Sequence, residues 1–406
     1  MRRQTLLVVF VLIVLSLSAC QTVSPNTDDL VPPSQFPTLD DFWNGTAEFR
    51  VDVPDTGLPL GESDTILLPD GELRSYLHAS YQSAGVVDQC GDPVPFPGCI
   101  VIYTSQDNGR TFLPLTDQDG PLQCRLACNQ CPCDSKIDHV DQQQYPRVVM
   151  THADDATNAT NATKATDERW WMVYEYRANT FLSRSPDGLN WSTPRELPLT
   201  GIWADWLMPC REEEKIGPHP FVPGQYDCLV GSPPGIAFTQ HRGARGELFV
   251  FVGLGQNPGS MGCYFGPADG PTAMLRKCTH NPLFTALDTY GPLDVVDATA
   301  NPYFAFRTIS SADLLAVGPR HYLFYEGVRG PGPGAAGDTQ FGLGLARSTT
   351  DKIDGAWETF PGNPILVDLP GNVGLGHADV LVIDGQTILF TSLDNATRSR
   401  LVLTWR

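Results

Sequence analysis

The chain has 406 residues, of which 41% are hydrophobic and 18% are charged. This apolar content can fill a large core and excludes a disordered chain. The 38 glycines and 35 prolines exceed average usage, so turns are frequent and long helices are not expected. The formal charge of −19 would repel phosphate backbones and anionic lipid headgroups, which argues against nucleic-acid binding.

The N-terminus has the features of an export signal. Two arginines precede an apolar run over 6–17, which is too short to span a bilayer and is typical of a signal peptide. The order Leu-Ser-Ala-Cys at 17–20 resembles the bacterial lipobox, whose cysteine is lipidated. We predict a signal peptide over 1–19, lipidation of Cys20, a flexible tether over 20–45 and a cell-envelope location in which only the lipid contacts the membrane. The alternative is an ordinary signal cleaved near residue 19.

The other ten cysteines form an even set, as expected in an oxidising compartment. Local pairs are expected at Cys90–Cys99, Cys210–Cys228 and Cys263–Cys278. Two more bonds, of undetermined connectivity, would join Cys124, Cys128, Cys131 and Cys133. The first three of these have the spacing of an iron–sulfur site, but such clusters are assembled in reducing cytoplasm. We therefore expect disulfide-stapled loops.

One hairpin pattern recurs along the chain: a pivot residue, a β-rich run, a tight turn and a second β-rich run. The pivots of its five copies are Asp64, Arg147, Gly235, Asp313 and Asp379. The steps between them are 83, 88, 78 and 66 residues, which suit four-stranded blades lengthened by loops. Radial repetition protects the sheet edges, so the sequence predicts an all-β fold, a five-bladed β-propeller.

The ring needs one more strand to close. The last copy has only about three strands, the third at 401–405, before the sequence ends. The β-rich run at 48–53 would supply the fourth, so the predicted propeller covers 46–406 and is closed by an N-terminal strand.

Two outer turns share a second signature. Ser105-x-Asp107-x-Gly109 leads to Phe112, and a form one residue shorter at 185–191 contains Asp187. A stretched form lies at 348–357. In such a turn the carboxylate caps amides and the glycine takes positive φ, so these aspartates are expected to be structural.

These turns, the hairpins and the Asn-Pro links at 281 and 363 resemble those of the five-bladed glycoside hydrolases of family 43 and its relatives, including the fructosidase and arabinanase types. The resemblance covers about residues 46–406. It implies an exported enzyme that hydrolyses a glycosidic bond of a carbohydrate substrate with two carboxyl groups in an axial pocket. An enzyme of this kind requires no cofactor, although a Ca²⁺ ion at the centre of the propeller is possible. We expect a monomer.

The resemblance also implies site residues. The catalytic carboxyls would be Asp64, as base or nucleophile, with Asp313 and Glu326, the latter as acid. Residues that would bind substrate are Arg147, Arg329, Glu175, His78 and Asp379. Gly-x-Gly-His at 374–377 resembles the motif of the family's last blade, in which His377 would face the axis and help to hold a cation.

Two departures keep other functions open. Arg147 stands where the family usually has an aspartate, and 232–235 replaces its glutamate acid. Either the site is rebuilt around Asp313 and Glu326, or the propeller binds a glycan or a protein without cleaving it. A third alternative is a sialidase-like enzyme, in which Arg147, Arg307 and Arg329 would clamp a carboxylate.

Overall fold

The architecture was analysed in a computed structural model of the chain. It describes residues 35–80, 98–117, 120–121, 144–150, 170–176, 179–192, 194–197, 235–239, 246–254, 259–267, 275–286, 305, 308–329, 340–367, 377–393 and 396–406. The chain separates into two compact units, and every helix and strand named below lies in the unit Phe36–Arg406.

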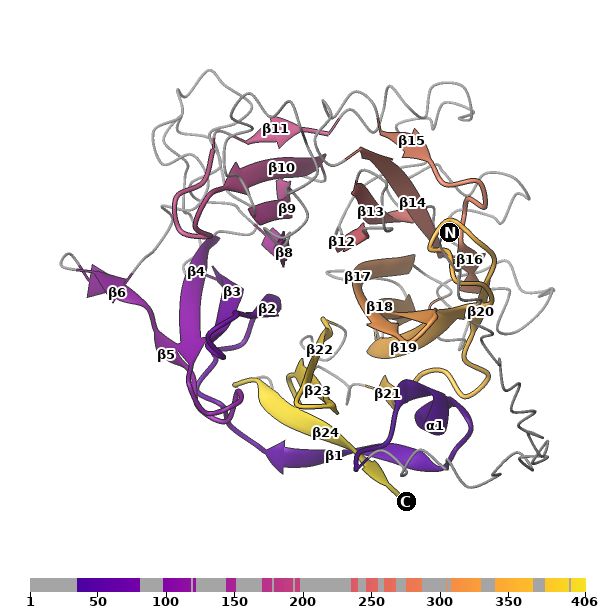
Figure 1. Ribbon diagram of the computed structural model, residues 1–406, viewed down its shortest axis with the longest axis horizontal. Coiled ribbons are helices and arrows are strands. Elements are labelled where there is room, and N and C mark those ends of the chain that lie inside the picture. Colours follow the sequence, from indigo (N-terminus) through magenta and orange to yellow (C-terminus); the bar gives the residue numbers. More distant parts are fainter. Residues whose placement is uncertain are drawn as a thin grey trace, which may run out of the picture. The chain divides into compact units, whose positions relative to one another are not determined.

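Five antiparallel sheets form the blades of a β-propeller (Figure 1), which confirms the predicted fold class. Blade I contains β2 (Ser63–Leu67), β3 (Leu73–Ser80), β4 (Gly98–Ser105) and β5 (Leu113–Pro114). Blade II contains β8 (Gln144–Met150), β9 (Trp170–Tyr176), β10 (Asn179–Ser185) and β11 (Arg195–Glu196). Blade III contains β12 (Gly235–Thr239), β13 (Glu247–Leu254), β14 (Ser260–Pro267) and β15 (Arg276–Lys277), with β16 (Phe284–Thr285) also on β14.

Blade IV contains β17 (Thr308–Val317), β18 (Arg320–Arg329), β19 (Gln340–Ser348) and β20 (Trp357–Thr359), with β21 (Leu366–Val367) also on β19. Blade V contains β22 (Asp379–Ile383), β23 (Gln386–Thr391), β24 (Ser399–Trp405) and β1 (Ala47–Val53). A small ribbon pairs β6 (Thr116–Asp117) with β7 (Gly120–Pro121).

The innermost strands β2, β8, β12, β17 and β22 contact one another in a closed circuit. Each contains the pivot residue of one sequence copy. The apolar core lies between the blades: every neighbouring pair is joined by its own cluster of buried side chains. Between blades V and I, for example, Phe112 and Phe390 meet edge to face at 5.4 Å. The inner ends of the blades are therefore held at a common axis.

The N-terminal run supplies the outer strand of the last blade. β1 pairs with β24 from Ala47 opposite Trp405 to Val53 opposite Arg400. Before it, helix α1 (Leu39–Trp43) is capped by Thr38, and Leu39 is buried in the core between blades IV and V. The compact unit thus begins ten residues before the predicted boundary at 46, because the short apolar segment at 39–43 packs against the propeller.

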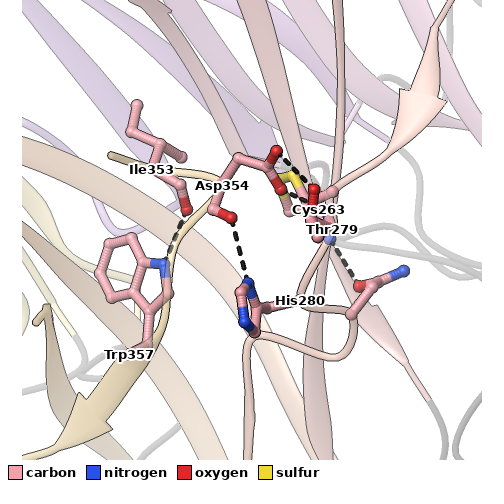
Figure 2. Close-up of a disulfide and its surroundings, with 8 residues drawn as sticks. Cys263, Thr279, His280, Ile353, Asp354 and Trp357 are labelled. Carbon is pink, nitrogen blue, oxygen red and sulfur yellow. Dashed lines mark hydrogen bonds between the residues drawn. A yellow bond between two sulfur atoms is a disulfide. The ribbon is translucent and has the colours of Figure 1, made fainter. Parts of the chain in front are cut away.

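One predicted disulfide, Cys263–Cys278, joins β14 to the residue after β15. Figure 2 shows its surroundings, where Asp354 accepts hydrogen bonds from the amide and hydroxyl of Thr279. This contact links blade III to the turn before β20. Cys20 and the other predicted pairs, including Cys90–Cys99, lie outside the residues whose side chains are described. Within the described ranges, no helix has the length and hydropathy of a membrane span.

Candidate active site

The pivot residues form a ring of buried side chains at the axis. Asp64 and Asp379 lie at the starts of β2 and β22, whereas Arg147 and Asp313 lie in the middle of β8 and β17, and all four are buried. The carboxylate oxygens of the three aspartates lie within 4.8 Å of one another. The pivot of blade III is Gly235, which contributes no side chain. The predicted pivots therefore do meet at the axis, in a cluster that we call the pivot ring.

Each aspartate of the pivot ring bonds to the next blade. Asp64 accepts a hydrogen bond from the amide of Val148, and Asp313 accepts one from the amide of Val380 at 2.6 Å. Asp379 accepts from the amide and hydroxyl of Thr65, at 2.9 and 2.7 Å, and from the Ser63 hydroxyl. In each case the donor amide is one residue beyond the neighbouring pivot. These three carboxyls therefore join successive blades.

Arg147 supplies the positive charge of the pivot ring. Its side chain is 1% exposed, and its guanidinium lies 3.6 Å from the Asp64 carboxylate. It donates at 2.8 Å to the backbone oxygen of Ser63 and to the hydroxyl of Ser311. A shift of register in β17 places Ser311, at φ 45°, for this contact. Because carboxylates are the oxygen ligands of hard cations, the three aspartates have the donors for a cation such as Ca²⁺, in a cluster that already contains this guanidinium.

Burial keeps protons on the pivot ring. It raises the pKa of Asp313 to about 7, against the opposing charge of Arg147, and Asp379 raises it further. Burial also raises the pKa of Asp64 well above its ordinary value, as does the Asp313 charge. Three carboxyls this close cannot all ionise beside one guanidinium.

A second set of side chains lies two residues before four of the pivots in the sequence. Its members are Glu62, Tyr145, Ser311 and His377, joined by His78 and Glu326 from the second strands of blades I and IV. We call Glu62, His78, Tyr145, Glu326 and His377 the upper cluster.

His377 contacts two carboxyls in the upper cluster, of which Glu326 is buried and Glu62 is largely buried. Its Nε2 lies 3.2 Å from Glu62 Oε1 and 3.3 Å from Glu326 Oε2. The second oxygen of Glu62 meets His78 Nδ1 at 2.8 Å, and Glu326 Oε1 accepts from the Ser310 hydroxyl at 2.8 Å. One imidazole thus connects two carboxyls whose other oxygens are held by separate partners.

The two carboxyls have opposite pKa shifts. Burial alone would raise the pKa of Glu62, but the charges of His377 and His78 outweigh it and lower that pKa to about 2. For Glu326, burial prevails over the His377 charge and raises the pKa above its usual value. At mildly acid pH Glu62 is therefore the ionised partner, and Glu326 is the one that holds a proton longer.

Tyr145 closes one side of the upper cluster. Its ring packs on His377 with centroids 5.1 Å apart, and its φ is 52°, where β8 shifts register. Burial, and then the charges of Glu62, Glu175 and Glu326, raise the pKa of its phenol well above the usual value. The phenol is therefore a neutral hydrogen-bond donor. Non-glycine residues in this conformation are uncommon and cluster at functional sites.

Two nitrogens of the upper cluster have no hydrogen-bond partner among the described residues. Among the described residues, His78 Nε2 and His377 Nδ1 are buried without a hydrogen-bond partner. Buried polar atoms of this kind normally have a partner, so these two mark a place for a polar ligand group.

The sequence predictions map onto these two clusters unequally. Glu326, His78 and His377 lie in the upper cluster, and Glu175 lies on β9 close enough to affect the Tyr145 phenol. Arg329 ends β18 three residues after Glu326, so the two side chains face opposite sides of the sheet. Arg307 is outside the described residues.

Sequence reasoning missed Glu62 and Ser311. Both lie two residues before an aspartate pivot, the same offset that separates His377 from Asp379. That common offset is the signal that could have found them.

No known protein family and no curated protein matches the sequence. Among solved structures, an endo-arabinase from Bacteroides thetaiotaomicron VPI-5482 is 12% identical, over 88% of this chain and 97% of that chain, with a TM-score of 0.45. A glycoside hydrolase is 12% identical over 91% and 95%, with a TM-score of 0.48. An exo-1,5-α-L-arabinanase from a bovine ruminal metagenomic library is 11% identical over 87% and 94%, with a TM-score of 0.43. At these levels the likeness concerns the fold and not the activity.

Proposed function

We propose that this propeller is a glycoside hydrolase whose catalytic pair is Glu62 and Glu326. The observation that carries the proposal is that both carboxyls, Glu326 buried and Glu62 largely buried, lie within 3.3 Å of the same nitrogen, His377 Nε2. Glycoside hydrolysis needs a pair of carboxyl groups that flank the scissile bond, one as acid and one as base or nucleophile. The sequence resemblance to family 43 supports the same reaction class.

Their environments suit two different roles. A low pKa keeps Glu62 ionised, as a nucleophile or base requires, and the raised pKa of Glu326 favours the protonated form that an acid requires. The unpartnered nitrogens of His78 and His377 support binding of sugar hydroxyls.

The spacing favours retention of configuration. Because Glu62 Oε1 and Glu326 Oε2 lie 3.2 and 3.3 Å from one nitrogen, they are at most about 6.5 Å apart. Retaining enzymes have carboxyls ~5–5.5 Å apart, and inverting enzymes ~6.5–9.5 Å. We therefore propose that Glu62 attacks the anomeric carbon while Glu326 protonates the leaving oxygen, and that Glu326 then deprotonates the water that releases the sugar.

The test is a turnover screen on arabinosyl, xylosyl, fructosyl, galactosyl and sialyl substrates. We expect Glu62→Gln and Glu326→Gln to reduce turnover by at least about 100-fold. Glu326→Gln should be least impaired on dinitrophenyl glycosides, whose leaving group needs no proton. Glu48→Gln, in the outer strand β1, is the matched control and should keep full activity. Proton NMR of the first product would show whether its configuration is retained.

The same substrates also test the prediction from the sequence that Asp64 and Asp313 are catalytic. If Asp64→Asn abolishes turnover in a folded protein and Glu62→Gln does not, the catalytic pair belongs to the pivot ring. The hydrogen bonds that Asp64 and Asp313 accept from backbone amides favour a structural role for these two carboxyls instead. Arg147 is held by Ser63, Ser311 and Asp64, which lends little support to a sialidase-like carboxylate clamp.

A second candidate function is glycan binding without cleavage. It is favoured by the amide bonds of the pivot-ring carboxyls, which leave fewer acids available for chemistry. Absence of turnover on every substrate, together with binding on a glycan array, would establish it.

We also propose that the protein is exported and lipid-anchored at Cys20. The basic, apolar and Leu-Ser-Ala-Cys segments support this location. Metabolic labelling with a fatty-acid analogue should mark the wild type and not Cys20→Ser. Equal labelling of both proteins would reject the anchor.

A further inference from the structure

Arg398 lies one residue before β24 and is completely buried. Its Nη1 donates to the backbone oxygen of Gly61 at 2.5 Å. Its Nη2 donates to the backbone oxygens of His377 and Phe390, each at 2.7 Å. One guanidinium therefore binds three carbonyls, one from blade I and two from blade V.

These carbonyls belong to the backbone that carries the upper cluster. Gly61 directly precedes Glu62, and the His377 carbonyl is that of the bridging histidine itself. Phe390 lies opposite Asp379 in the pairing of β22 with β23. Arg398 thus binds the backbone next to Glu62 in blade I and the backbone of His377 in blade V, and so spans the same two blades as the Glu62–His377 contact.

The geometry and charge of Arg398 suit this position. A guanidinium presents its donors in a rigid planar fork, so it fixes the carbonyls that it binds relative to one another. Burial lowers the pKa of Arg398 to about 10, opposed by the Asp379 carboxylate, so the group stays charged at neutral pH.

We propose that Arg398 is a positioning residue that sets the distance between Glu62 and His377. Its catalytic consequence rests on the proposed function, whereas the positioning itself does not. Without its fork, the Gly61 and His377 carbonyls lose their common donor, and the strand starts that carry the pair are held by the hydrogen bonds of Asp379 to Ser63 and Thr65. The backbone at Glu62 and His377 can then shift.

Arg400 provides a matched control. It lies two residues further along the chain and is also buried, at 3% exposure. It donates to the backbone oxygen of Asn108 and pairs with Asp52, and neither residue belongs to the pivot ring or the upper cluster. Arg400→Ala therefore shows the effect of losing a buried arginine from this segment, without loss of the hydrogen bonds that Arg398 makes to Gly61 and His377.

The experiment compares Arg398→Ala, Arg398→Lys and Arg400→Ala in the full chain. The first readout is the side-chain ¹H–¹⁵N signal of His377 at one fixed pH, assigned with His377→Gln. The second is kcat and KM on the substrate found in the screen. We expect both Arg398 variants to shift the His377 signal and to lower kcat about 10- to 100-fold with little change in KM. Guanidinium at a non-denaturing concentration should restore both readouts in Arg398→Ala, and Arg400→Ala should change neither.

An unchanged His377 signal and unchanged kcat in folded Arg398→Ala would overturn the proposal. So would unfolding of both Arg398 variants while Arg400→Ala folds, because Arg398 would then serve the stability of the fold alone. A shifted, guanidinium-sensitive His377 signal in a protein with no turnover would support the positioning and reject the proposed hydrolase.

Discussion

At the scale of single residues, the axis contains two kinds of acid with different partners. The carboxyls of the pivot ring are bonded to backbone amides and to one arginine, whereas those of the upper cluster form ion pairs with imidazoles. Amide partners fix a carboxyl in place, and imidazole partners can exchange a proton with it. The two groups therefore contribute to different properties, stability and chemistry.

Replacing Arg147 by Met is expected to destabilise the fold strongly. It leaves buried carboxyls without their cation, and breaking a buried pair costs roughly 3–5 kcal/mol. Urea unfolding of Arg147→Met against the wild type measures the loss. Arg110→Met is the control, because its pair with Asp52 is on an exposed side chain and contributes less than about 1 kcal/mol. Similar losses in both variants would contradict a special role for Arg147.

Stability is expected to fall as the pH rises through neutrality. With a folded pKa of about 7 and an ordinary value of 3.8, Asp313 binds its proton more tightly in the folded state. Its contribution is therefore complete below about pH 3.8 and is lost as the pH rises through about 7. Urea unfolding at several pH values from 5 to about 8 tests this. In Asp313→Asn the pH dependence should be much weaker, and an unchanged slope would assign it to another group.

At the scale of elements, two outer turns are stabilised in the same way, by an aspartate that accepts hydrogen bonds from the amides of its own turn. Asp107 accepts hydrogen bonds from the Ser105 hydroxyl and from the amides of Arg110 and Thr111. Asp187 caps its own turn in the same way. Gly109 has φ 78°, and a Cβ there would lie 2.5 Å from the Phe390 ring. The turn role predicted for both aspartates is confirmed.

Asp107→Ala should cost about 1–2 kcal/mol of stability, because two turn amides lose their acceptor. Activity should not change, since the turn lies on the outer part of blade I. Thermal unfolding measures the loss, and Asp107→Asn, which keeps one acceptor oxygen, should lose less. Equal losses in the two variants would show that the carboxylate charge matters more than the acceptor.

At the scale of the whole molecule, the first described strand pairs non-covalently with the last. β1 completes blade V, and Asp379 bonds to Thr65 and Ser63 of blade I. Among the described residues, the larger apolar clusters lie between neighbouring blades. Loss of one contact therefore weakens the packing of two blades.

Removal of residues 1–53 should lower the melting temperature and promote aggregation. The deletion exposes the edge of β24, and an unpaired edge strand is a template for pairing with another chain. Light scattering and thermal unfolding test both effects. Removal of residues 1–35 only is the control and should leave the melting temperature of the unit Phe36–Arg406 unchanged. Equal stability of the two truncated proteins would show that β1 is dispensable.

The hairpin pattern was sufficient to predict the five blades and the meeting of their pivots, because both follow from local alternation and repeated spacing. It could not predict Glu62, which in the sequence resembles any acid in a turn. Its partner His377 is 315 residues away, and only the closed ring brings them together. The shifts of register at Tyr145 and Ser311 were also invisible, because backbone strain of this kind is imposed by the surrounding packing.

The bond between Asp379 and Thr65 also implies an order of events during biosynthesis. The two residues are separated by 314 positions, so blade I leaves the ribosome long before its neighbour in blade V exists. Until then the inner edge of β2 and the apolar side chains of blade I that pack on Phe390 lack their final cover. A nascent chain of this protein thus has a first blade that lacks its neighbour on one side for most of its translation. A chaperone that shields this blade would act on the N-terminal part of the chain, and would be released when the last strands arrive.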